Sequence, residues 1–217
     1  LLRESAERLG AAVEFWSARA SRDEESAERL ASASTRLVSA MILAARLDME
    51  RGIRAADGGD METSRASFRL AIAGFEGAEN VAREAVERFA SMSAAQPANG
   101  ALRRGLLASH HALGEARMWT AKGHERIVEK HGDEDAGAMA ARAHESALAA
   151  YLDALEIAEE LTSSDASNLT AQRDLALCLN KVGNEQRDLG RLNEASRTFE
   201  QSRRVREDLA ASDPTAE

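Results

Sequence analysis

Proline, cysteine and aromatic residues are scarce in this chain, and each scarcity narrows the range of possible folds. Its 217 residues include two prolines, one cysteine and 4% aromatic residues. β-Branched residues are also sparse, and the apolar content comes mainly from Ala and Leu, which favour helices over sheets. The single cysteine, Cys178, excludes an intramolecular disulfide and fits a reducing cytosol. The composition therefore predicts an all-α protein.

An excess of basic residues is missing as well. The formal net charge is −9, whereas nucleic acids and anionic membrane surfaces attract basic patches. The most apolar stretch, Leu37–Leu47, spans eleven residues, and a membrane-crossing helix needs about 20. We therefore expect a cytoplasmic chain that binds neither nucleic acid nor membrane.

Catalytic motifs are absent from the sequence. It contains no phosphate-binding glycine loop, no G-x-S-x-G nucleophile turn and no paired catalytic carboxylates. Two His-Glu dipeptides, at 124–125 and 144–145, resemble the start of the HExxH zinc motif, but Val128 and Leu148 stand where the second histidine is required. We expect neither an enzyme nor a cofactor in this chain.

Periodic apolar residues separated by turn signals predict about seven helices. An apolar stripe with spacings of three and four residues marks the first, over Leu2–Ala20, and Asp23 is suited to cap the second. The second should end near Asp57-Gly58-Gly59-Asp60, and the third at Gln96-Pro97. The others are expected over roughly 101–130, 138–162, 168–190 and from 193 onward.

An internal repeat groups these helices into hairpins. At one constant offset, Ala147, Tyr151, Leu161 and Asp165 recur as Ala195, Phe199, Leu209 and Asp213. At a second, longer offset, Gln96, Asn99, Leu106 and Gly114 recur as Asp165, Asn168, Leu175 and Gly183. We predict an α-solenoid containing the second helix of a truncated repeat (1–22), two long hairpins (23–97 and 98–166) and a shorter one (167–217).

The last hairpin resembles a tetratricopeptide repeat. The family's signature glycines, alanine, aromatic and small residue correspond to Gly183, Gly190, Ala195, Phe199 and Ser202. The middle hairpin keeps Gly114, Ala147, Tyr151 and Ala154 but is longer by about three turns in each helix, an extension that we place at its tip. The first hairpin has Val38 where the glycine belongs. The resemblance implies a scaffold that binds proteins or peptides, which in bacteria often accompanies a signalling catalytic domain.

The resemblance also implies a binding groove. In the family, the first helix of each hairpin lines a concave face. The corresponding residues are His111, Glu115, Met118 and Trp119 in the middle hairpin, and Asn180, Asn184, Arg187 and Asp188 in the last. Trp119 would anchor an apolar side chain, or would lie partly buried between long helices. The Asn and Arg side chains would hold a peptide backbone or carboxylate, or would be ordinary solvated surface.

Two other functions are compatible with the sequence. Self-association into a homodimer or filament would require an exposed apolar stripe on the first or last helix. A metal or pH sensor would use the histidines, all of which lie in the middle hairpin: His110, His111, His124, His131 and His144. His124 and His144 are equidistant from the tip, so the hairpin could bring them together. Alternatively, these histidines occupy the half-buried edge of a helix seam.

Overall fold

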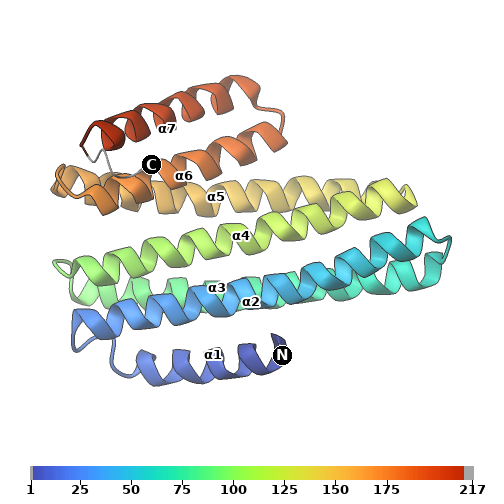
Figure 1. The fold of residues 1–217 in the computed structure, drawn as a ribbon, viewed down its shortest axis with the longest axis horizontal. Helices are drawn as coiled ribbons and strands as arrows, with labels where there is room; N and C mark the ends of the chain where they lie inside the picture. The colour runs from blue at the N-terminus through green and yellow to red at the C-terminus, as the bar shows by residue number, and fades with distance from the viewer. Residues whose placement is uncertain (1, 213–217) are drawn as a thin grey trace.

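Seven helices and short turns form the computed structural model, which describes residues 2–212. The helices are α1 (Leu2–Ser17), α2 (Glu24–Asp57), α3 (Met61–Ala95), α4 (Gly100–His131), α5 (Glu134–Ser164), α6 (Leu169–Asp188) and α7 (Leu192–Ser212). No strand occurs within 2–212, and the hairpins α2–α3, α4–α5 and α6–α7 stack in chain order (Figure 1). The predicted all-α hairpin stack is confirmed. Asp213, the last residue of one sequence match, lies outside the described residues.

Side-chain caps fix where most helices begin. An aspartate or asparagine accepts a hydrogen bond from the backbone of the first turn of α2 to α6; these caps are Asp23, Asp60, Asn99, Asp133 and Asn168. Because Asp133 caps α5, this helix begins at Glu134, four residues before the predicted start at 138.

The hairpins differ in length in the way the sequence predicts. Helices α2 to α5 contain 31 to 35 residues, whereas α6 and α7 contain 20 and 21. The two long hairpins therefore project past the α6–α7 turn on the right of Figure 1. Their tips lie together, since Nε2 of His131 at the end of α4 is 3.0 Å from the hydroxyl of Ser64 at the start of α3.

The core consists of alanines on helix faces and a few buried aromatic rings. Helix α3 packs against both α2 and α4, and its Phe68, Phe75 and Phe89 are at most 1% exposed. On α5, Tyr151 is fully buried. Between the rings, small side chains let the helices approach closely, which compensates for the scarcity of large apolar residues.

The terminal helices present no apolar stripe in the described part of the chain. On α1, Val13 and Trp16 pack against the cluster that contains Leu30 of α2. The exposed large apolar residues of these two helices are Phe15 and Leu192. Val13 and Trp16 of the predicted stripe are thus used within the stack.

The residues of the first hairpin that match the last hairpin lie at its tip, whereas sequence analysis placed Val38 at the glycine position. At a single constant offset, Gly52, Gly59, Ser64, Phe68 and Ala71 recur as Gly183, Gly190, Ala195, Phe199 and Ser202. Val38 is a buried mid-helix core residue. The first hairpin is extended at its base, so an alignment that starts from the base of α2 places Val38, and not Gly52, at the glycine position.

The two signature turns share one backbone geometry. Gly59 and Gly190 have φ of 82° and 75°, in the left-handed region. In each turn the glycine N–H donates to the carbonyl three residues earlier and the next N–H donates to the carbonyl five residues earlier, which is the Schellman pattern. The longer bond runs from Asp60 to Ala55 at 2.9 Å and from Arg191 to Gln186 at 2.7 Å.

Equivalent positions on α3 and α7 differ in polarity. Ile72 and Phe75 of α3 lie against α4 near Gly123. The residues at the same repeat positions of the last hairpin are Arg203 and Arg206, both exposed on α7. The same repeat positions are therefore packed in the first hairpin and exposed to water in the last.

Helix α2 is unusually apolar for its length. Among residues 2–212 it is the one helix long and apolar enough to cross a membrane, with a mean hydropathy of 1.3 over its best 18-residue window. The stretch 37–47 is only the most apolar part of this helix. In this fold, 39% of the window is buried inside the stack, and the helix packs on α1, α3 and α4.

Candidate functional site

The first helices of the three hairpins, α2, α4 and α6, form the face on which sequence analysis placed a groove. Helices α2 and α4 pack directly against each other. Helices α4 and α6 are linked by three ion pairs, Arg104–Asp174 at 3.4 Å, Glu115–Lys181 at 2.8 Å and Lys122–Asp188 at 2.9 Å. The sign of the charge alternates along each helix, so these pairs match only in one register.

Most of the predicted groove residues on α4 are already engaged. Glu115 is paired with Lys181, and Met118 packs against the buried cluster around Tyr151. The ring of His111 meets that of Tyr151 edge-on, at a centroid distance of 5.6 Å. Burial lowers the pKa of His111. These side chains are therefore part of the packing between α4, α5 and α6.

Trp119 lies between two other side chains. Its ring stacks on Phe75 of α3 with centroids 6.1 Å apart, and the guanidinium carbon of Arg46 lies 4.3 Å from its centroid. A cation over an indole face is a favourable contact. The indole thus occupies the seam between α2, α3 and α4 and is not an open anchor.

The predicted residues on α6 face two directions. Asn184 donates to Asn180 at 3.2 Å, and Asn180 lines a groove of about 350 Å³ together with Phe199 of α7. Arg187 and Lys122 both contact Asp188, which faces α4. The eight predicted residues therefore do not converge on one groove.

An open trough between α2 and α4 was missed by sequence analysis. It has a volume of about 440 Å³, and its lining consists largely of small residues: Ala31, Ser32, Thr35, Ala101, Gly105 and Ala108. Glu28, Arg36 and Arg104 complete the wall. Gly105 is required there because a Cβ would collide with the ring of Phe89 beneath it. The signal in the sequence was the run of small residues at helical spacing on both helices.

Two exposed leucines extend the trough along α2. Leu43 and Leu47 are 46% and 52% exposed. The successive spacings from Ser32 through Arg36 and Leu43 to Leu47 are four, seven and four residues, which keeps all four on one side of the helix. Arg36 makes no ion pair or hydrogen bond with any residue of 2–212. This side of α2 thus carries two exposed leucines and an arginine whose charge is not neutralised by a neighbouring carboxylate of the described chain.

A buried imidazole joins α4, α5 and α6 farther toward the tip. Nδ1 of His144 is 2.7 Å from Oε2 of Glu185, and Nε2 is 3.0 Å from Oε1 of Glu125. Burial alone would lower the pKa of His144, but hydrogen bonds to the two carboxylates outweigh it and raise the pKa to about 9. The group is an imidazolium held between two carboxylates, which ties the three helices together.

The other histidines do not join His144. Burial lowers the pKa of His124, and the nearby Glu76 of α3 opposes this shift. His124 thus interacts with Glu76 of α3, whereas His144 is held by Glu125 and Glu185. No group of three or more His, Cys, Asp or Glu residues in the range 2–212 has the arrangement of a metal site.

Three solved structures are similar to this chain in fold. No protein-family model and no curated protein matches it. The crystal structure of the de novo designed helical repeat protein DHR64 is similar with a TM-score of 0.47 and 19% identity, over 97% of this chain and 82% of that one. The DHF58 filament gives 0.30 and 19%, over 97% and 93%, and the DHF38 filament 0.31 and 20%, over 100% and 99%. These identities are too low to indicate a shared function.

Proposed function

We propose that this chain is a non-catalytic scaffold of tetratricopeptide type whose α2–α4 trough binds an extended segment of another protein. The observation that supports this function best is the trough itself. It is open and largely apolar, and its lining consists mainly of small side chains. Because the lining side chains are small, the backbone of a bound segment can lie close to α2 and α4.

The chemistry of the face defines the segment. Apolar side chains of the ligand would lie over Ala108 and against Leu43 and Leu47. An acidic side chain or backbone carbonyl of the ligand would accept from Arg36, whose guanidinium has no other partner among the described residues. We therefore expect short apolar segments flanked by an acidic residue.

Peptide display followed by affinity measurement tests this proposal. Selected peptides should bind the intact chain, and Ser32→Trp, which fills the trough from an exposed position, should remove binding. Ser91→Trp is the matched control, because Ser91 is exposed on α3 and does not line the trough. Helical content and melting temperature should stay unchanged in both variants.

Two outcomes would contradict the proposal. Selection of no peptide would leave the trough without the proposed ligand, and equal weakening by both tryptophan variants would place the ligand elsewhere. Sedimentation of the unliganded chain distinguishes the self-association alternative. A dimer that dissociates on Leu43→Ala plus Leu47→Ala would mean that a second copy occupies this face.

A further inference from the structure

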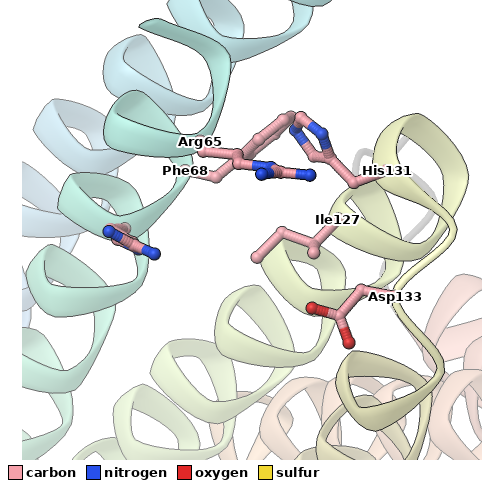
Figure 2. Close-up of a pocket in the computed structure, with 6 residues that line it drawn as sticks. Arg65, Phe68, Ile127, His131 and Asp133 are labelled. Carbon is pink, nitrogen blue, oxygen red and sulfur yellow. The ribbon is translucent and has the colours of Figure 1, made fainter. Parts of the chain in front are cut away.

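A separate pocket lies between the tips of the two long hairpins. Its volume is about 450 Å³, and its lining comes from α3, from the end of α4 and from the turn that follows: Arg65, Phe68, Arg69, Ile127, His131 and Asp133 (Figure 2). The trough lies near the opposite end of α4, at residues 101–108. The two sites can therefore be tested independently.

Two unpaired cations form one wall of this pocket. Arg65 and Arg69 are one turn apart on α3, so they share a face of that helix. Neither makes an ion pair or hydrogen bond with any residue in 2–212. The chain has 37 acidic residues against 28 Lys and Arg, so these guanidinium groups are not unpaired for want of carboxylates. In Figure 2 the guanidinium of Arg65 extends toward His131 and Ile127.

The apolar part of the pocket is rigidly held. Phe68 is 1% exposed, and the position of a Cβ on Gly52 is 3.3 Å from its ring. His131 meets this ring edge-on, with centroids 5.8 Å apart, while its Nε2 is fixed by the Ser64 hydroxyl at 3.0 Å. Nδ1 of His131 is buried without a hydrogen-bond partner. A preformed wall of this kind reduces the entropy lost on binding.

Asp133 limits how much negative charge a ligand of this pocket can carry. One of its carboxylate oxygens, Oδ1, accepts a hydrogen bond from the N–H of Ala136 at 3.2 Å and so caps α5. The carboxylate lies below Ile127 in Figure 2, away from Arg65. A ligand with two negative charges would be repelled by this carboxylate more strongly than a ligand with one.

We propose that this pocket binds a carboxylate carried on an apolar group. The carboxylate lies on the guanidinium of Arg65, Arg69 supplies a second positive charge one turn away, and the apolar group lies against Ile127. A guanidinium offers two parallel N–H donors to the two oxygens of a carboxylate. Asp133 favours this monoanion over a phosphate dianion.

The carboxylate can come from a free organic acid or from the C-terminus of a peptide, and two probes distinguish these sources. One is hexanoate, with hexan-1-ol and hexyl phosphate as matched comparisons. The other is a short peptide that ends in leucine, compared with its C-terminal amide. NMR titration of the intact chain should show the His131 imidazole responding to hexanoate at millimolar concentration, and less to the alcohol and the phosphate.

Binding should also change the titration of His131. Burial lowers its pKa, and Arg65 lowers it further. A bound carboxylate partly neutralises Arg65, so it should raise the His131 pKa. A ligand that binds elsewhere would leave this titration unchanged.

Three variants complete the test. Arg65→Gln plus Arg69→Gln should weaken hexanoate binding by at least about tenfold, whereas Arg142→Gln, on an exposed residue of α5 outside the pocket, should not. Asp133→Asn keeps a good helix cap and should tighten binding.

Equal binding of hexanoate and hexan-1-ol would overturn the proposal, and so would a failure of both carboxylate probes to bind. Unchanged hexanoate affinity in the Arg65→Gln plus Arg69→Gln variant, with an unchanged melting temperature, would also overturn it. A response to the peptide acid but not to hexanoate would identify a chain terminus as the ligand. The reverse would identify a free acid.

Discussion

Gly183 of α6 faces the ring of Phe199 on α7 so closely that a Cβ on the glycine would lie 2.7 Å from Cε1 of the ring. A Cβ on Gly114 would likewise lie 2.6 Å from Cε1 of Tyr151 on α5. Each pair joins the two helices of one hairpin. The glycine is thus needed for the approach of an aromatic ring, which explains its place in the repeat signature.

Replacing these glycines with alanine should destabilise the fold. A Cβ at position 183 must displace a ring, so we expect Gly183→Ala to cost about 1–3 kcal/mol in the free energy of unfolding, despite the better helix propensity of alanine. Urea denaturation followed by circular dichroism measures the change. Gly10→Ala is the control, because nothing lies within 4 Å of its added Cβ and α1 should gain stability. Equal effects at both positions would contradict the close-contact explanation.

The left-handed turn glycines should be sensitive for a different reason. Gly59 and Gly190 have open space around an added Cβ, but their positive φ strains any other residue. We expect Gly59→Ala and Gly190→Ala each to cost about 1–2 kcal/mol, measured by thermal unfolding. Gly58→Ala should cost less, since Gly58 has φ of −83°. A similar loss at all three positions would mean that backbone conformation is not the cause.

Stability should decrease as the pH rises from 6.5 to 9. The pKa of His144 is about 9 in the fold and its ordinary value is 6.5, so the folded chain retains a proton that the unfolded chain releases. The stabilisation from this imidazolium is complete below pH 6.5 and is lost as the pH rises through 9. The urea midpoint measured across this range should therefore fall.

Substitution of His144 tests the assignment of this pH dependence. His144→Gln should remove the decrease between pH 6.5 and 9 and should reduce stability at neutral pH, because Glu185 is then buried without the imidazolium that bonds to it. His110→Gln should preserve the decrease, since burial lowers the pKa of His110. A decrease that survives in the His144 variant would assign it to another group.

Cys178 should react slowly while the chain is folded. Its side chain is fully buried, and burial, together with the neighbouring Asp174, raises the pKa of its thiol to about 12. Little thiolate exists at pH 8, so alkylation by iodoacetamide should be limited by unfolding. Mass spectrometry of a time course should show rapid modification in urea and slow modification without it. Rapid labelling of the native chain would contradict this burial.

The sequence predicted the helices well because their boundaries depend on local chemistry. The Asp57-Gly58-Gly59-Asp60 turn and the cap at Asp23 act within one or two turns of the chain. The start of α5 was predicted four residues late, because the prediction did not include Asp133 as its cap.

The candidate sites were harder to predict because they depend on how helices pack. Spacing put Glu115 and Asp188 on the correct helices, but it could not show that lysines on neighbouring helices already neutralise them. The tip pocket joins Arg65 to His131, which are far apart in sequence and meet only because the two long hairpins end at the same level. No local pattern carries that information.

The base extension of the first hairpin obeys a rotational rule. Gly52 lies deeper in α2, measured from Glu24, than Gly183 lies in α6, measured from Leu169. The difference is about four helical turns: at about 100° per residue, the added segment rotates the helix by roughly 1,400°, within about 40° of four complete turns. Helices lengthened by near-whole turns keep the same side toward their neighbours. An extension at the base of a hairpin therefore keeps the buried stripe inward only when it comes close to whole turns, and an insertion of intermediate length there would turn that stripe toward water.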